Sequence, residues 1–289
     1  MREAGDVAGA TLYVSLEPCA HEGRTGSCAR ALAPLGLARV VVGTLDPNPL
    51  THGKGAQMLR DAGVAVEIAD DEEARRLIEP FSVAIERRRP FVALKMAISL
   101  DGFAAAYPGE RTRLTGDAWS AYVRDLRAAH DAVMVGAGTV RVDDPLLTVR
   151  PLRHRLRPYV RVVVAGRTPI PPASRILAPT EGYDPTIVLA PDAGAEALDL
   201  EAALRGLSAR GIRSILCEGG PALATALIER DLVDRFYWAI APVLLGSKGV
   251  PALLPGSPAT FGRELRFDTI ERFDDDVMLS GKFAPCSAA

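Results

Sequence analysis

The sequence predicts an α/β protein with two domains. Valine-rich strand patterns alternate with helical patterns, an order that favours a parallel sheet. A length of 289 residues is that of two ordinary domains, although one larger domain is allowed. The basic run at 87–89 and the following Pro90 interrupt the pattern, so we place the boundary there, with domains at 1–86 and 90–285. The basic run is typical of a solvated linker; contact with a phosphate-rich partner is the alternative.

The first domain is expected to contain short strands and helices in turn. Strands are predicted at 11–15, 39–45 and 64–68, and helices at 29–35, 54–62 and 70–87. The third helix is predicted from apolar residues that share one face, and Asp70 or Asp71 is its candidate N-cap.

The second domain continues with more strands than helices. Strands are predicted at 91–99, 132–135, 160–165, 186–190, 214–217 and 236–241. Helices are predicted at 117–130, 198–210 and 221–230, and a closing hairpin at 267–283. Asp117 is a candidate N-cap, and Pro221 fits the first turn of its helix. Proline- and arginine-rich loops are expected at 151–158 and 168–185.

The composition excludes several classes of function. The chain is 48% hydrophobic and 24% charged, as is typical of a soluble globular protein. Its net charge of −2 gives no reason to expect nucleic acid or an anionic membrane surface as a partner. We find neither an apolar run of about 18 residues nor a secretory signal. Four unevenly spaced cysteines do not suggest a disulfide framework, so a reducing cytoplasm is the expected location.

Cys19 and Cys28 are the candidate metal ligands. Cys19 follows a strand pattern and Pro18, and Cys28 precedes a helical run. The dipole at the start of a helix favours a thiolate, which is the form that binds metal. Two free thiols explain this spacing equally well. A catalytic zinc needs three protein ligands, and we do not expect His21 or His52 to supply the third.

The turn Glu218–Pro221 is a candidate phosphate site. Its two glycines lie between a strand pattern and a helix, so backbone N–H groups and the positive end of a helix dipole would face a ligand. The turn lacks the G-x-G-x-x-G fingerprint of a Rossmann fold. A tight turn that needs glycine only for packing is the alternative.

The segment 136–150 carries an unusual set of polar residues after a strand. Thr139 supplies a hydroxyl, Asp143 and Asp144 supply carboxylates, and Arg150 can hold a phosphate with two parallel hydrogen bonds. A capped turn followed by a surface arginine is the alternative, but it does not explain all of these residues together. We favour a ligand-binding role.

Lys95 and Ser99 interrupt an otherwise apolar strand pattern. A lysine in such a strand either extends from the edge of a sheet or faces a ligand. The spacing of residues does not decide between these two interpretations.

Five segments, in this order, resemble the bifunctional deaminase-reductase of riboflavin biosynthesis. They are Leu16–Thr25 with Cys28, Asp46–Pro49, Lys95–Gly102, Gly138–Arg150 and Glu218–Pro221. The resemblance covers nearly the whole chain. It implies a truncated cytidine-deaminase-like α/β domain followed by a dihydrofolate-reductase-like α/β domain. The implied activity is the NADPH-dependent reduction of the ribosyl group of 5-amino-6-(5-phosphoribosylamino)uracil to a ribityl chain, by a homodimer.

The resemblance also implies roles for individual residues. The cofactor-binding positions are Ala97, Arg113, Thr139, Asp143, Gly166, Gly219, Gly220, Pro221, Ala222 and Leu223. The substrate-binding positions are Arg111, Leu147, Arg150 and Glu218. In the implied site Arg150 holds the sugar phosphate, and Asp143 is the candidate for proton transfer.

Two arginines depart from the family pattern. The family usually has Gly-Glu-Ser-x-Trp where this chain has Gly-Glu-Arg-Thr-Arg at 109–113. Arg111 thus replaces a serine that meets the substrate, and Arg113 replaces a tryptophan that packs on the cofactor. Ala165 and Gly166 stand where the family often has aspartate and then serine or threonine. Two alternatives therefore stay open: a reductase for another pteridine- or pyrimidine-like substrate, and a nucleotide-binding protein without turnover.

The resemblance implies that the zinc site is incomplete. Residues 1–5 align just after the His-Ala-Glu segment of the family, so the ligand histidine and the catalytic glutamate are missing. Zinc would then have two thiolates, and no base would move protons between water and the ring. We expect the deaminase half to be inactive in this chain; an upstream start codon is the competing explanation.

Overall fold

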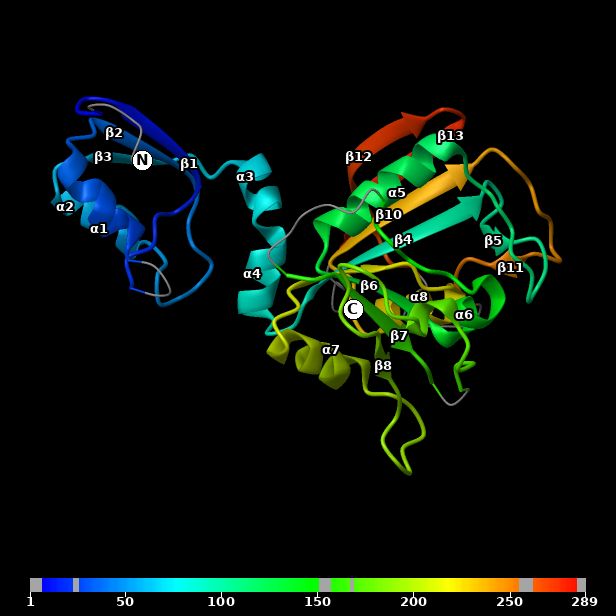
Figure 1. Ribbon diagram of the computed structural model, residues 1–289. Helices are drawn as coiled ribbons and strands as arrows, with labels where there is room; N and C mark the ends of the chain where they lie inside the picture. The colour runs from blue at the N-terminus through cyan, green and yellow to red at the C-terminus, as the bar shows by residue number, and fades with distance from the viewer. Residues whose placement is uncertain (1–6, 23–25, 151–156, 167–168, 255–261, 285–289) are drawn as a thin grey trace. The chain divides into compact units, whose positions relative to one another are not determined.

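The computed structural model describes residues 7–22, 26–150, 157–166, 169–254 and 262–284. It divides into two compact units, Met1–Arg89 and Pro90–Ala289 (Figure 1). Most of the loop expected at 151–158, Cys286 and the motif residues 23–25 lie outside the described residues.

The first unit is built on a parallel sheet with the strand order β1-β2-β3. The strands are β1 (Thr11–Leu16), β2 (Arg39–Thr44) and β3 (Ala65–Ile68), and between them lie α1 (Cys28–Leu32), a 3₁₀ turn (Ala33–Leu35) and α2 (Lys54–Asp61). Val40, Val42 and Leu59 are fully buried, because the inward residues of β2 alternate and meet one face of α2. The predicted alternation of strands and helices is confirmed here.

The prediction of one helix at 70–87 is wrong. Two helices stand there, α3 (Glu72–Leu77) and α4 (Glu79–Glu86). Asp71 is the N-cap of α3, and its side chain accepts a backbone N–H at 2.8 Å. Pro80 lies in the first turn of α4, where its missing N–H is tolerated, but a proline cannot continue a helix that began earlier.

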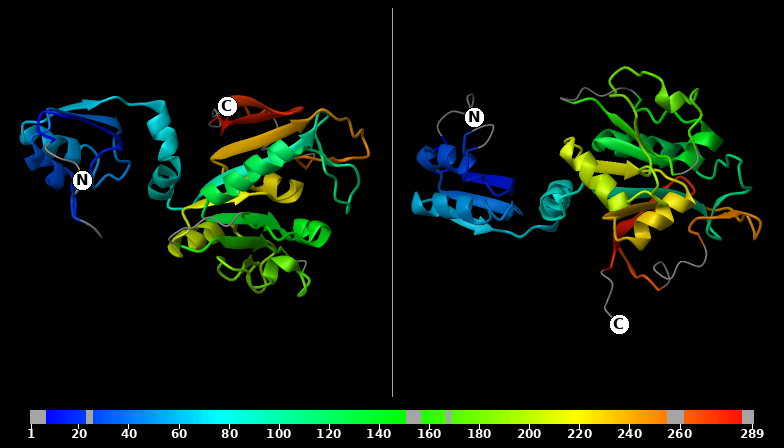
Figure 2. Two further views of the ribbon diagram at one scale, coloured as in Figure 1. Left: turned by 45° about the horizontal axis from the view of Figure 1, so that its top comes forward. Right: turned by 90° about the horizontal axis from the view of Figure 1, so that it is seen from below.

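An eight-stranded sheet forms the centre of the second unit. The strands are β4 (Phe91–Ser99), β6 (Ala132–Gly136), β7 (Val160–Val164), β8 (Ile187–Leu189), β9 (Ser214–Cys217), β10 (Arg235–Ala241), β12 (Leu265–Phe273) and β13 (Asp276–Phe283). Their order is β12-β13-β10-β4-β9-β6-β7-β8, and the strands from β10 to β8 are parallel. The antiparallel hairpin of β12 and β13, red in Figure 2, lies at one edge beside β10. Two short strands, β5 (Phe103–Ala105) and β11 (Val250–Pro251), form a separate pair.

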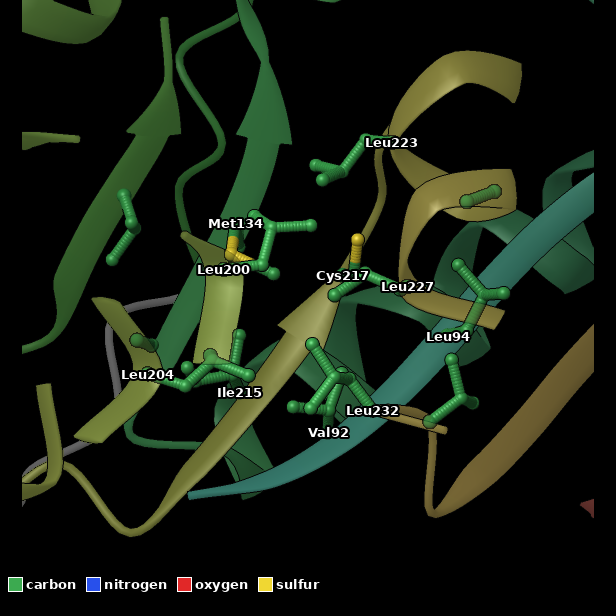
Figure 3. Close-up of a cluster of buried hydrophobic side chains, with 14 of the residues drawn as sticks. Val92, Leu94, Met134, Leu200, Leu204, Ile215, Cys217, Leu223, Leu227 and Leu232 are labelled. Atoms are coloured by element: carbon green, nitrogen blue, oxygen red, sulfur yellow. The ribbon is translucent and has the colours of Figure 1, made fainter. Parts of the chain in front are cut away.

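Helices cover both faces of this sheet. Helices α7 (Leu200–Ala209) and α8 (Pro221–Glu229) pack on one face, where leucines of the helices meet Val92 and Leu94 of β4 (Figure 3). Helix α5 (Asp117–Ala129) packs on the other face. Among the described residues, no helix is long and apolar enough to cross a membrane.

The two faces of β4 have different roles. Leu94 and Met96 belong to the core under α7 and α8. Because side chains alternate along a strand, Lys95 and Ala97 face the side of α5. Strand β4 lies between β10 and β9, so the interpretation of Lys95 as a residue at a sheet edge is excluded.

Two further local features differ from the expected elements. Helix α6 (Ala137–Asp143) occupies a segment for which no helix was predicted, and it ends at Asp144, which has a φ of 39°. Asp117 is not an N-cap, because Gly116 holds that position and Asp117 is the first helical residue of α5. An aspartate is favourable there too, since the first turn is the positive end of the helix dipole.

Candidate active site

The carboxyl ends of the parallel strands lie together on one side of the sheet. Open α/β sheets bind ligands just outside these strand ends. Helix α6 starts directly after β6, and α8 starts shortly after β9. Their N-caps are Gly136 and Gly220, and glycine has no side chain to occupy the free N–H groups of the first turn. Pro221 and Ala222 form the first turn of α8. The start of α8 therefore offers N–H donors and the positive end of a dipole to an anion.

Two glycines bring the start of α8 close to its neighbours. A Cβ added to Gly219 would lie 2.8 Å from Leu223 Cδ2, so no larger residue fits there without a shift. A Cβ added to Gly220 would lie 3.5 Å from Thr139 Oγ1, which places the Thr139 hydroxyl beside the turn. The structure thus brings Thr139 of α6 close to Gly219, Gly220 and Leu223, and all four residues are predicted cofactor contacts.

A buried ion cluster lies immediately before this turn. Glu218 accepts hydrogen bonds from Arg127 Nε at 2.5 Å and from Arg127 Nη2 at 2.8 Å, and Lys95 Nζ lies 3.8 Å from its carboxylate. The side chains are 7% exposed for Glu218, 20% for Arg127 and 19% for Lys95. The backbone N–H of Glu218 donates to Met134 of β6 at 2.9 Å, which fixes the residue at the end of β9. One carboxylate therefore faces two cations in a mostly dry environment.

The charges set the protonation of this cluster. Burial alone would raise the pKa of Glu218, but Arg127 and Lys95 bring it below its ordinary value, so Glu218 is ionised. Burial lowers the pKa of Lys95, although Glu218 opposes this effect. Lys95 is therefore the cation of the cluster that releases a proton more readily, since guanidinium stays charged. Burial also raises the pKa of the adjacent Cys217 thiol to about 12, so this thiol is unreactive.

Asp143 and Arg111 belong to the electrostatic surroundings of this cluster. Partial burial raises the pKa of Asp143 at the end of α6, while Arg111 and Lys95 act to lower it. Asp143 is thus within the field of two cations from different segments. The predicted proton-transfer residue and the predicted substrate contact at Arg111 therefore lie in one electrostatic neighbourhood with Lys95.

The loop that follows α6 is held in a constrained conformation. Leu147 has a φ of 51°, which is uncommon for a residue with a side chain, and it is buried in a cluster with Val135 and Val163. Leu147, which was predicted as a substrate contact, is thus a core residue in the structure. Arg150 at the end of this loop is exposed, and its Nε donates to Thr148 Oγ1 at 2.9 Å.

The remaining predicted cofactor contacts are more scattered. Ala97 lies on the same face of β4 as Lys95. Gly166 is exposed just after β7, with a φ of 59°. Arg113 donates to Asp117 at 2.6 Å, and both side chains are largely exposed. Arg113 is therefore attached to the start of α5, because within the described part of the chain its hydrogen bonds go to Asp117 and to the Thr115 carbonyl.

Arg127 is the member of the ion cluster that the sequence interpretation missed. It follows the buried residues Trp119 and Val123 of α5 at helical spacing, so it points inward with them. An arginine at an inward position of an amphipathic helix is a signal for a buried partner. The sequence alone does not identify Glu218 as that partner, because 91 residues separate the two.

The two candidate zinc ligands lie together, but they do not form a complete site. The backbone N–H of Cys28 lies 3.3 Å from Cys19 Sγ. His21 Nδ1 lies 3.3 Å from Thr51 Oγ1, and His52 Nδ1 lies 2.9 Å from a backbone oxygen. Within the described residues, no group of three or more His, Cys, Asp and Glu side chains is arranged to hold a metal ion. A zinc ion therefore does not fit the donor set that the described residues provide.

Residues 90–279 match the family described as the RibD C-terminal domain. The riboflavin biosynthesis protein RibD of Aquifex aeolicus is 38% identical over 261 residues, which is 84% of this chain and 72% of that protein. RibD of Escherichia coli K12 is 35% identical over 310 residues, covering 96% of this chain and 84% of that protein. Among solved structures, Acinetobacter baumannii RibD (form 1) matches with a TM-score of 0.82 and 34% identity, covering 98% of this chain and 84% of that one. A deaminase and 5-amino-6-(5-phosphoribosylamino)uracil reductase from Thermotoga maritima matches with a TM-score of 0.83 and 31% identity, covering 98% of this chain and 82% of that one.

The chain belongs to the RibD family of riboflavin biosynthesis proteins. Its α/β fold, with the mixed sheet of the second unit, matches the solved RibD structures. The family resemblance that the motifs predicted is thereby confirmed.

Proposed function

We propose that the second unit reduces the ribosyl group of 5-amino-6-(5-phosphoribosylamino)uracil to a ribityl chain with NADPH. Membership of the RibD family supports this proposal, as does the activity named for the similar Thermotoga maritima protein. The observation that carries it is the buried cluster of Glu218, Arg127 and Lys95 immediately before the open start of α8. This arrangement offers a site for an anionic cofactor beside a polar site for a sugar.

NADPH fits the residues at the start of α8. Within Gly219–Leu223, the backbone N–H groups of residues other than Pro221, which has none, would hold its phosphates, and the Thr139 hydroxyl lies beside this turn. Further proposed contacts are Ala97, Arg113, Asp143 and Gly166. When bound, NADPH supplies the hydride. The role of the chain is to bind the cofactor, to orient it and to exclude water.

The substrate is proposed to lie between the ion cluster and Arg150. The exposed guanidinium of Arg150 would hold the sugar phosphate with parallel hydrogen bonds. Each carboxylate oxygen of Glu218 accepts one bond from Arg127, which leaves lone pairs for sugar hydroxyls. Leu147 and Arg111 complete the proposed substrate contacts. Arg127 holds the Glu218 carboxylate in one orientation.

Lys95 and Asp143 are the proposed proton-transfer groups. Reduction at the sugar carbon also requires a proton, and Lys95 can donate one because burial lowers the pKa of its ammonium group. Partial burial raises the pKa of Asp143, so this carboxyl can carry the next proton toward Lys95.

The test of this proposal is an assay of NADPH oxidation with the phosphoribosylamino substrate and identification of the ribityl product by mass spectrometry. We expect oxidation and product in equal amounts. Oxidation only with another pteridine or pyrimidine would identify the alternative substrate class, which the arginine at position 111 leaves open. Tight NADPH binding without oxidation of any tested substrate would indicate a binding protein without turnover.

We further propose that the first unit is a cytidine-deaminase-like domain that does not deaminate in this chain. The adjacent thiols of Cys19 and Cys28 are the basis for the likeness, and the missing third ligand among the described residues is the basis for inactivity. Metal analysis of the purified chain tests this. One zinc ion per chain would overturn the proposed inactivity.

A homodimer is also proposed, from the family resemblance alone. The chain has a mass of 30.7 kDa. Light scattering should give about twice this mass for the purified protein, and the mass of a single chain would exclude the dimer.

A further inference from the structure

Tyr183 is held rigidly beside strand β7, far in sequence from the ion cluster. An isolated bridge pairs it with Tyr159, where the Tyr159 N–H donates to Gly182 and the Asp184 N–H donates to Tyr159, both at 2.9 Å. The rings of Tyr159 and Tyr183 stack, with centroids 5.3 Å apart. Backbone and ring together therefore fix the direction of the Tyr183 hydroxyl.

This hydroxyl contacts the predicted substrate loop. The backbone N–H of Val149 donates to the Tyr183 hydroxyl at 2.6 Å. Val149 is 5% exposed, so its N–H has little access to water if this bond is lost. It lies between the strained Leu147 and the exposed Arg150. One side-chain oxygen thus holds the backbone next to the residue proposed to bind the sugar phosphate.

The buried guanidinium of Arg161 packs against the Tyr183 ring. Arg161 of β7 is 1% exposed, and its guanidinium lies 5.2 Å from the centre of the Tyr183 ring. Arg161 Nη2 donates to the Ala178 carbonyl at 2.9 Å, while Nε and Nη1 find no acceptor among the described residues. An incompletely bonded buried cation costs stability. The contact with the Tyr183 ring gives this buried cation a role in fixing that ring.

The charges of both Arg161 and Arg127 act on the Tyr183 hydroxyl. Burial raises the pKa of its hydroxyl, and the fields of Arg161 and Arg127 act in the opposite direction. Tyr183 is therefore within electrostatic range of Arg127, which binds Glu218. Tyr183 therefore contacts the substrate loop through Val149 and is electrostatically coupled to Arg127 of the ion cluster.

We propose that Tyr183, supported by Arg161, is a positioning residue that sets the affinity for the phosphorylated sugar. It acts through Val149, whose backbone it holds so that Arg150 faces the sugar phosphate. This inference rests on the proposed function, in which Arg150 binds that phosphate. Tyr183 itself does not touch the reacting atoms in this scheme, so its effect is on substrate binding and not on the chemical step.

The first test is Tyr183→Phe, which keeps the stacked ring and removes only the oxygen that accepts the Val149 N–H. We expect the KM for the phosphoribosylamino substrate to rise about tenfold, the size of one buried hydrogen bond, with unchanged kcat and unchanged Kd for NADPH. Tyr13→Phe is the matched control. This substitution also removes a hydroxyl that accepts a hydrogen bond, in this case from Arg39 at 3.2 Å, but Tyr13 lies in the first unit and KM should stay unchanged.

The second test separates positioning from general support of the fold. In the Arg150→Ala background, Tyr183→Phe should raise KM much less than in the wild type, because its effect acts through Arg150. Equal and independent effects of the two substitutions would overturn the inference. A parallel loss of NADPH affinity in Tyr183→Phe would also overturn it, because it would indicate a structural role only.

The inference and the proposed function fail in different ways. Lack of turnover by the wild-type chain would remove the proposed function. The Kd for ribose 5-phosphate, measured by calorimetry, would then still test the role of Tyr183. Tyr183→Phe should raise this Kd about tenfold. Turnover by the wild type, with the same KM and the same Kd for this probe in Tyr183→Phe, would remove the inference alone.

Discussion

Each of the two units brings charged or reactive side chains together, but among the described residues only the group in the second unit has a partner for each of its members. In the second unit, Glu218 binds Arg127 at 2.5 and 2.8 Å and has Lys95 at 3.8 Å. In the first unit, Cys19 and Cys28 are adjacent, and the described residues add no third ligand. The difference shows that proximity of two reactive side chains does not make a site. A site also needs partners that satisfy each buried charge or each coordination position.

The largest effect is expected for Glu218→Gln, which breaks the complete group. The substitution leaves Arg127 and Lys95 as two buried cations without a carboxylate, so the free energy of unfolding should fall by about 3–5 kcal/mol. Urea denaturation measures this change, and NADPH oxidation should be lost with it. Glu201→Gln is the control, because its exposed pair with Arg205 should contribute at most about 0.5 kcal/mol. Equal losses of stability in the two variants would show that the buried ion pairs of Glu218 contribute no more than the exposed pair of Glu201.

Lys95→Met should separate function from stability in the same group. We expect kcat to fall about 100-fold if Lys95 donates the proton, while Glu218 keeps its bonds to Arg127. Stability should rise by about 1 kcal/mol near neutral pH. Burial lowers the pKa of Lys95 from its ordinary value of 10.5, so between the lowered pKa and 10.5 the unfolded chain binds a proton that the folded chain lacks. Wild-type stability therefore rises with pH in this window. Below the lowered pKa, the full cost of burying the charged Lys95 side chain remains.

The stability of Lys95→Met should lack this rise with pH, because methionine does not titrate. Thermal unfolding of both proteins over the alkaline range measures the difference. Identical pH profiles for the two proteins would show that Lys95 keeps its ordinary pKa. Unchanged turnover would assign the proton transfer to Asp143 alone.

Gly219→Ala tests the turn between the ion cluster and α8. The added Cβ would lie 2.8 Å from Leu223 Cδ2 and 3.0 Å from Leu223 Cβ, so the turn must shift. We expect a loss of about 1–3 kcal/mol in stability and a rise of about tenfold in the Kd for NADPH, measured by fluorescence titration. Gly206→Ala is the matched control in α7, where a Cβ meets nothing within 4 Å and alanine favours the helix. A wild-type Kd in Gly219→Ala would mean that this turn does not hold the cofactor.

Periodicity and turn chemistry predict much of the fold. The alternating strands, the helix after Pro221 and the terminal hairpin are found close to their expected bounds. The break before Pro80 was missed because an apolar face can continue across two helices. Helix α6 was missed because glycines and aspartates at 136–144 are typical of a loop, and packing of Val140 against the sheet outweighs that preference.

Less of the candidate site than of the fold could be predicted from the sequence. Motifs located the glycine turn and Glu218, because those residues are contiguous in the chain. The bond between Arg127 and Glu218 joins residues 91 positions apart, and the bond between Val149 and Tyr183 joins residues 34 apart. No local pattern contains such pairs, since the order of strands in the sheet decides which segments meet. Tyr183 accordingly gave no signal in the sequence.

The smallest effect is expected for Cys28→Ser in the incomplete group. Cys28 is exposed, and a hydrogen bond with Cys19 together with partial burial raises the pKa of its thiol, so it is mainly protonated at neutral pH. Serine at this position should change the free energy of unfolding by less than about 0.5 kcal/mol and leave NADPH oxidation unchanged. Thermal unfolding with and without added zinc is the measurement. A stabilisation by zinc that the wild type shows and Cys28→Ser lacks would mean that the two thiols do hold the metal, because a ligand that binds only the folded chain raises its stability. The contrast between a complete and an incomplete group would then have to be abandoned.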